Sequence, residues 1–277
     1  MSPTPQAQSD MPHKNLQFLE LEHRAATATT WVWLNRPTVR NAFSDAVIAE
    51  LTAAFTQLGN DTNVRSIVLA ARGVAFCAGA DLGWMRRMAD YSLTENEADA
   101  MGLATMLHTI YACPKPVIAR VQGDAFAGGV GLVAACDAAV GVATVRFCLS
   151  EVKLGLIPGT IAPYVVRAMG QRHAQRYALS AEVFNAEAAK SCGLLHETTA
   201  DLAELDAQIA AWCNNFAAAS PQALGDCKRL LDAVGLAENT LALREETAKR
   251  IAQSRASDDG KAGVAAFLNK TPPPWVV

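Results

Sequence analysis

Two glycine-bearing turns, about one supersecondary unit apart, constrain this chain more than any other feature. The first is Phe76-Cys77-Ala78-Gly79-Ala80-Asp81 and the second is Ala127-Gly128-Gly129-Val130-Gly131. Each stands where an apolar strand gives way to an expected helix, so main-chain N–H groups at its tip lack carbonyl partners. Two such groups aimed at one point can hold a carbonyl oxygen that is becoming an enolate. The alternative is that the glycines only permit tight turns.

A lone carboxylate, Glu151, follows the second turn. Apolar residues surround it in the sequence and predict an apolar wall: Phe147, Leu149, Val152, Leu154 and Leu156. Such a wall would raise the pKa of Glu151 toward the range useful for proton transfer. We therefore expect Glu151 to carry a proton beside the two turns, against the alternative of a solvated carboxylate at a strand end.

Other polar residues favour structural roles. Asp81 falls near a helix start, where the helix dipole stabilises a carboxylate, and Asp137 falls at a strand start. The five histidines show no metal-ligand spacing and none accompanies a G-x-S-x-G serine. The sequence also lacks G-x-G-x-x-G and G-K-[ST] motifs. We therefore expect no metal, no hydrolase triad and no nucleotide-phosphate site.

Apolar runs and helical periodicity alternate through the first two thirds of the chain. Strands are predicted at residues 29–35, 65–71, 117–121 and 138–143. Helices are predicted from Ser44 to Gly59, from the end of a polar segment (residues 90–99) to Tyr111, and from the second turn to Ala135. Helices dominate from about Ala162 to Lys270, with caps expected at Ser180 and Ser220 and a helix end at Gly193. The alternation indicates an α/β fold with right-handed crossovers.

Composition narrows the class of protein. Of 277 residues 51% are apolar, and the net charge of −3 gives no reason to expect a nucleic acid or a membrane as partner. Asp137 and several glycines interrupt the apolar stretch 125–145, so we expect a buried strand–helix junction there.

The seven cysteines form no C-x-x-C pair, which favours a reducing compartment, expected to be the cytoplasm. We divide the chain into a flexible tail (1–12), an α/β core (13–200) and a helical region (201–277).

The residues from about position 16 to the C-terminus resemble the enoyl-CoA hydratase/isomerase (crotonase) superfamily. Six blocks in the expected order carry the resemblance: Leu34-Asn35-Arg36-Pro37 with Asn41-Ala42, Phe76 to Asp81, Lys115-Pro116, Gly128-Gly129 with Cys136-Asp137, Glu151 to Gly159, and Ala266 to Lys270. The resemblance implies a crotonase-like spiral of ββα repeats with a C-terminal helical trimerisation region. It implies an acyl-CoA substrate, self-association as a homotrimer or dimer of trimers, and no redox or metal cofactor.

The resemblance also assigns site residues by position. The oxyanion-hole N–H groups fall on Ala80 and Gly128, and one catalytic glutamate falls on Glu151. The second catalytic glutamate of two-glutamate hydratases falls on Gly131, so that carboxylate is missing. Contacts to CoA or to a substrate carboxylate are expected from Ala78, Arg86, Arg87 and Lys270, the alternative for the two arginines being a solvated helix face.

The missing glutamate leaves three functions open. The first is a hydratase acting on a branched or carboxylated enoyl-CoA, because the segments 80–88 and 147–153 look most like those of bacterial 3-methylglutaconyl-CoA hydratases and of relatives acting on isohexenylglutaconyl-CoA. The substrate's own carboxylate, or an ordered water in the space that Gly131 leaves, would then substitute for the glutamate. The second is a single-glutamate Δ3,Δ2-enoyl-CoA isomerase, and the third is a non-catalytic acyl-CoA-binding paralogue.

Overall fold

The strands are divided between two β-sheets in the computed structural model, which describes residues 16–276. The larger sheet has the order β1 (Leu19–Arg24), β2 (Thr29–Leu34), β3 (Ser66–Ala71), β5 (Val117–Val121), β7 (Ala138–Val142) and β10 (Glu197–Thr199). The smaller has the order β4 (Ala75–Cys77), β6 (Asp124–Phe126), β8 (Arg146–Cys148) and β9 (Phe184–Asn185). Pairing is antiparallel for β1–β2 and β8–β9 and parallel elsewhere.

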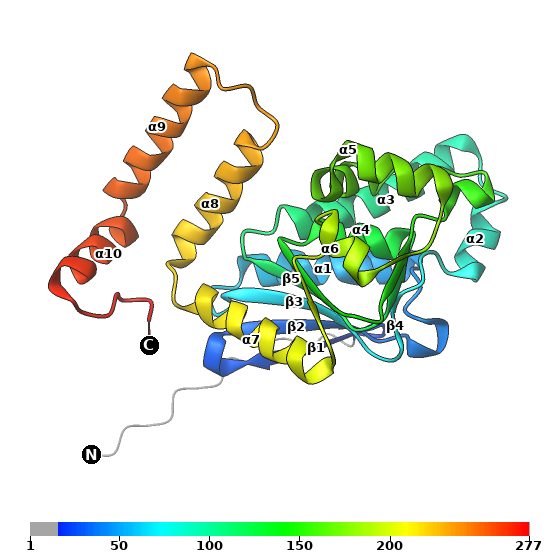
Figure 1. The fold of residues 1–277 in the computed structure, drawn as a ribbon, viewed down its shortest axis with the longest axis horizontal. Coiled ribbons are helices and arrows are strands. Elements are labelled where there is room, and N and C mark those ends of the chain that lie inside the picture. Colours follow the sequence, from blue (N-terminus) through cyan, green and yellow to red (C-terminus); the bar gives the residue numbers. More distant parts are fainter. Residues whose placement is uncertain (1–15, 277) are drawn as a thin grey trace.

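Each central repeat therefore sends one strand to each sheet before a helix follows, which confirms the predicted α/β fold of ββα repeats. The body contains α1 (Asp45–Asn60), α2 (Leu82–Met88), α3 (Leu93–Tyr111), α4 (Gly128–Ala135), α5 (Ala162–Ser180), α6 (Ala186–Ser191) and α7 (Leu202–Ala217). Three further helices form an arm that stands off the body: α8 (Pro221–Val234), α9 (Leu241–Ala256) and α10 (Asp258–Asn269) (Figure 1). The predicted tail, residues 1–12, lies outside the described residues.

Local sequence signals explain the first body helix. The Ser44 hydroxyl accepts a hydrogen bond from the N–H of Val47 and so caps α1. The predicted apolar face is buried against the sheet core, at Val47, Leu51, Phe55 and Leu58. The strand predictions are confirmed to within a residue or two at each end.

Two predicted helix boundaries are wrong. The helix predicted after the polar segment 90–99 already begins at Leu93, because Ser92 and Glu95 form a reciprocal capping box. Its polar first turns are simply exposed. Ser180 caps no helix: it ends α5, and Asn185 caps the helix that follows. By contrast Ser220 caps α8, and Gly193 follows the end of α6 with a positive φ of 88°, as predicted.

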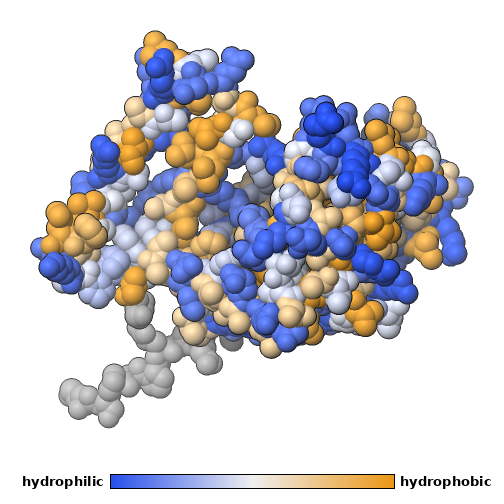
Figure 2. All heavy atoms as spheres, viewed as in Figure 1, coloured by the Kyte–Doolittle hydropathy of each residue, from blue (hydrophilic) through white to orange (hydrophobic). Residues whose placement is uncertain are grey.

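The arm has little core of its own. Gly225 is the buried residue of α8 and Ala266 that of α10, whereas α9 buries none. Figure 2 shows apolar side chains on the arm beside a hollow that faces the body. A cavity of about 730 Å³ lies there, between α8 and the C-terminal ends of α3 and α4.

The apolar stretch 125–145 forms β6, α4 and β7, which confirms the predicted strand–helix junction. Within residues 16–276, no helix combines the length and the apolar character that a membrane crossing requires.

Candidate active site

Three segments predicted to carry the chemistry meet at one edge of the smaller sheet. Cys77 pairs with Ala125 in the parallel register of β4 and β6, and Phe126 pairs with Cys148 in that of β6 and β8. Because the carboxyl ends of parallel strands lie at the same edge, the two glycine turns and the segment leading to Glu151 are neighbours. The turns approach closely: a Cβ atom built on Gly79 lies 3.2 Å from Ala127 Cβ.

The first turn is held by Phe43, which lies just before α1. The Phe43 N–H donates to the Gly79 carbonyl and the Asp81 N–H donates to the Phe43 carbonyl, both at 2.7 Å. In such a parallel bridge the residue between the two bonds, Ala80, turns its own N–H away from Phe43. Among residues 16–276 the Ala80 N–H has no acceptor. It is therefore a fixed and available donor, as the oxyanion assignment requires.

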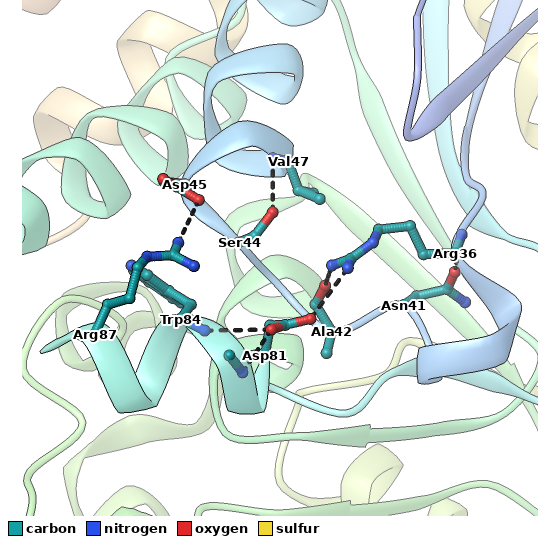
Figure 3. A network of polar contacts seen from close by, with 10 residues as sticks. Arg36, Asn41, Ala42, Ser44, Asp45, Val47, Asp81, Trp84 and Arg87 are labelled. Carbon is teal, nitrogen blue, oxygen red and sulfur yellow. Dashed lines mark hydrogen bonds and ion pairs between the residues drawn. The ribbon is translucent and has the colours of Figure 1, made fainter. Parts of the chain in front are cut away.

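Asp81 secures the same turn from its side chain (Figure 3). Its carboxylate accepts the N–H groups of Gly83 and Trp84 and so caps α2, and it pairs with Arg36 at 3.0 Å. The Arg36 guanidinium also donates to the Ala42 carbonyl. Although partial burial raises the pKa of Asp81, these hydrogen bonds hold that pKa below its usual value. Asp81 thus has the structural role predicted for it.

The second turn carries a strained residue. Ala127 has φ 48° and ψ −118°, a conformation that L-residues rarely adopt, and its N–H donates to the Cys148 carbonyl at 2.8 Å. Gly128 follows as the first residue of α4, with no side-chain cap at this end. Its N–H has no acceptor within the described part of the chain. The unpaired N–H of Gly128 therefore lies at the positive end of the α4 dipole, and both would stabilise a negative charge that develops there.

Glu151 begins a 3-10 helix (Glu151–Leu154) directly beyond β8. Its Oε2 atom is buried and has no hydrogen-bond partner among the described residues. Burial raises the pKa of Glu151. An unpaired buried carboxyl oxygen with a raised pKa is typical of a group that transfers protons.

The predicted apolar wall around Glu151 is only half correct. Phe147 and Leu149 are buried, whereas Val152, Leu154 and Leu156 are 36%, 61% and 53% exposed. Phe147 lies in β8 and Leu149 directly follows it, in a stretch that is buried from Phe147 to Leu149. The later residues lie on a short 3-10 helix and in the loop that follows it, at the surface of the protein.

The raised pKa makes a prediction about stability. Folded Glu151 binds its proton more tightly than unfolded Glu151, whose pKa is near 4.5, so stability is lost as pH rises from that value through the folded pKa. We expect Glu151→Gln to gain thermal stability relative to the wild type as pH rises from 4 to 8. Thermal unfolding across this range measures the difference. A difference that stays constant with pH would contradict the assigned burial of this charge.

The position of the missing glutamate is closed. A Cβ atom built on Gly131 would lie 2.2 Å from Ile161 Cγ2. The Ile161 side chain therefore occupies the space directly beside Gly131, whereas the hypothesis of an ordered water that replaces the glutamate stays a prediction.

The remaining predicted contact residues lie in different places. Ala78 is exposed beside the first turn, and its N–H donates to the Arg40 carbonyl. Arg87 pairs with Asp45 at 2.9 Å, so its charge already has a partner, whereas Arg86 is exposed and makes no ion pair with a described residue. Lys270 ends α10 on the arm, at the opposite side of the molecule from α2 (Figure 1). Within a single chain, Lys270 therefore lies far from the two glycine turns.

Asp137 also has a structural role. Its carboxylate accepts the Val117 N–H at 2.8 Å and the Lys228 ammonium at 2.7 Å, linking two strands to α8. Burial raises its pKa, an effect that Lys228 opposes. No group of three side chains suited to a metal ion gathers within residues 16–276.

Sequence reasoning missed two residues of the site, Phe43 and Ile161. Phe43 directly follows the Asn41-Ala42 block, and Ile161 follows Pro158-Gly159. Proximity to those blocks was the available signal, because neither residue belongs to a periodic pattern.

Comparison with known proteins adds an independent observation. The sequence profile described as enoyl-CoA hydratase/isomerase matches residues 25–276. The enoyl-CoA hydratase ACTT6 of Alternaria alternata is 35% identical over 242 residues, covering 86% of this chain and 78% of that protein.

Solved structures agree. An enoyl-CoA hydratase from Shewanella pealeana has a TM-score of 0.91 at 37% identity, covering 94% of this chain and 97% of that one. AtuE of Pseudomonas aeruginosa has a TM-score of 0.89 at 32% identity, covering 94% of this chain and 100% of that one.

Proposed function

The chain belongs to the enoyl-CoA hydratase/isomerase family, and we propose that it adds water across the α,β double bond of an enoyl-CoA thioester. One observation carries the proposal: the N–H groups of Ala80 and Gly128 lie at the same sheet edge as the buried Oε2 atom of Glu151, and none of the three has a hydrogen-bond partner among residues 16–276. The relatives named as hydratases support it.

The reaction follows from this arrangement. A water oxygen bonds to the β-carbon, and the π electrons move to the thioester oxygen, where the Ala80 and Gly128 N–H groups stabilise the enolate. The Glu151 carboxyl group delivers a proton to the α-carbon, and the carboxylate so formed recovers a proton from the water. The sum is the addition of H and OH. No oxidation state changes overall, so the reaction requires no redox cofactor.

We propose further that the substrate is branched or carboxylated, of the 3-methylglutaconyl-CoA type. The support is the closed position at Gly131, which leaves Glu151 without the second carboxylate of a two-glutamate site. A carboxylate on the substrate would take the place of the missing glutamate, by accepting a hydrogen bond from the attacking water and orienting it. Exposed Arg86 on α2 is the proposed partner for an anionic group of the substrate or of CoA.

A direct comparison tests this function. We expect hydration of 3-methylglutaconyl-CoA to exceed that of crotonyl-CoA by about 10²-fold or more in kcat/KM, because the second substrate lacks the carboxylate. Loss of the conjugated-thioester absorbance gives the rate, and mass identifies the hydrated product. Equal rates would contradict the role of the substrate carboxylate.

The same closed position also favours the second candidate, a Δ3,Δ2-enoyl-CoA isomerase, since one carboxylate suffices to move a proton between two carbons. Turnover of 3-enoyl-CoA without hydroxyacyl product would establish that alternative. Binding of CoA esters with no turnover of any of these substrates would instead indicate a non-catalytic paralogue.

We also propose self-association, as a homotrimer or dimer of trimers. The arm leaves large apolar side chains exposed, among them Leu236 at 80% and Phe267 at 83%. Lys270 lies far from the turns of its own chain, so a contact with CoA from Lys270 would come from a second copy (Figure 1).

A further inference from the structure

The Ile161 side chain packs directly against Gly131, in the place that a side chain at position 131 would take. A Cβ atom at position 131 would lie 2.2 Å from Ile161 Cγ2 and 2.7 Å from Ile161 Cβ, but 3.7 Å from Ile161 Cα. An ordinary contact between carbon atoms measures about 3.5–4.0 Å. No side chain therefore fits at position 131 while residue 161 carries a Cβ atom in its present place.

Neither partner has room to move aside. Ile161 is 2% exposed, and its carbonyl accepts the N–H groups of Tyr164 and Val165 at the start of α5. Every residue of α4 except Gly128 is buried, and α4 packs against α5. A clash here would strain two packed helices rather than displace a flexible surface group.

Position 131 lies next to the proposed oxyanion donor at Gly128. Residues three apart on a helix share a face, so a side chain at 131 would project beside the N–H of Gly128. We propose that Ile161 determines specificity by holding the site to a single carboxylate, Glu151, so that efficient turnover requires a substrate that brings its own second polar group. The kinetic part of this proposal rests on the proposed function, whereas the packing part does not.

The packing part is tested by thermal unfolding of four variants. We expect Gly131→Glu to lower the unfolding midpoint by about 5 °C or more, as overpacking a core does in a chain of this size. Combining it with Ile161→Gly should recover most of that loss, whereas combining it with Ile161→Ala should not, because the Cβ atom remains at 2.7 Å. Gly102→Glu is the matched control, since a Cβ atom at exposed Gly102 meets nothing within 4 Å.

Two results would overturn the packing part. One is a Gly131→Glu variant as stable as Gly102→Glu, which would show that position 131 is open. The other is equal recovery by Ile161→Ala and Ile161→Gly, which would show that the Cβ atom of residue 161 is not the barrier.

The kinetic part is tested on crotonyl-CoA, which has no carboxylate of its own. Gly131→Glu/Ile161→Gly should hydrate crotonyl-CoA about 10²-fold faster than Ile161→Gly does, the usual contribution of an added general acid or base. Gly131→Gln/Ile161→Gly, with the same bulk but no ionisable group, should show no gain. Equal rates for the two double variants would refute the proposal. A wild-type protein that turns over no enoyl-CoA would refute the proposed function while the unfolding data still decide the packing.

Discussion

Glu151→Gln is expected to lower kcat by about 10²–10⁴-fold, the contribution of a positioned general acid or base. The amide has nearly the shape of the carboxyl group but can neither give up nor take a proton at neutral pH. The donors at Ala80 and Gly128 remain in place, so the affinity for a non-reactive acyl-CoA should change little. Steady-state kinetics and calorimetric titration with a saturated acyl-CoA measure the two quantities separately.

Glu97→Gln provides the matched control. The Glu97 side chain lies exposed on α3 and makes no hydrogen bond with a described residue, so the same chemical change there should leave kcat unaltered. Substantial turnover by Glu151→Gln would remove Glu151 from the mechanism. Loss of acyl-CoA binding in parallel with kcat would instead assign Glu151 to the binding of substrate.

Gly128→Ala is expected to lower kcat by about 10²–10³-fold, the effect of losing one oxyanion donor. The added Cβ atom would lie 2.5 Å from Cε2 of Phe43, a ring that is 1% exposed and has no space to retreat. The N-terminal end of α4 must therefore shift. The N–H of residue 128 then no longer points to the same place as the N–H of Ala80. Stability should fall as well, by about 1–3 kcal/mol for an overpacked core.

Two companion variants separate the clash from the loss of a glycine. Gly102→Ala makes the same change on the exposed face of α3, where the new Cβ atom meets nothing, and should stabilise the helix by about 0.5–1 kcal/mol. Phe43→Leu removes the ring atoms in question and, combined with Gly128→Ala, should recover part of kcat. An unchanged kcat in Gly128→Ala alone would show that its N–H does not contact the reacting oxygen.

Local signals predicted the parts of the fold and site that depend on neighbours in the sequence. The cap at Ser44 and the apolar face of α1 follow from helical spacing, and strands β2, β3, β5 and β7 of the larger sheet follow from apolar runs. The short strands β4, β6 and β8, each three residues long, were not predicted, and their parallel pairing is what places the two turns and the segment leading to Glu151 at one edge.

The remainder depends on contacts between distant segments, which have no local signature. The bridge from Phe43 to Ala80 spans 37 residues of sequence, and Ile161 reaches Gly131 from the next repeat. Likewise hydrophobicity alone does not distinguish Leu149, which is buried, from Leu154, which is 61% exposed. Such pairings appear only when the chain is assembled in three dimensions.

The two proposed oxyanion donors belong to the main chain, whereas the proposed acid–base group is the side chain of Glu151. A codon change cannot delete a peptide N–H unless it introduces proline, although a new side chain can displace it, as expected for Gly128→Ala. A carboxylate, by contrast, is lost in a single exchange at position 151, and adding one at position 131 requires a second exchange at position 161. Enzymes that form a common enolate but differ in where protons come from thus lie only a few mutations apart on this scaffold.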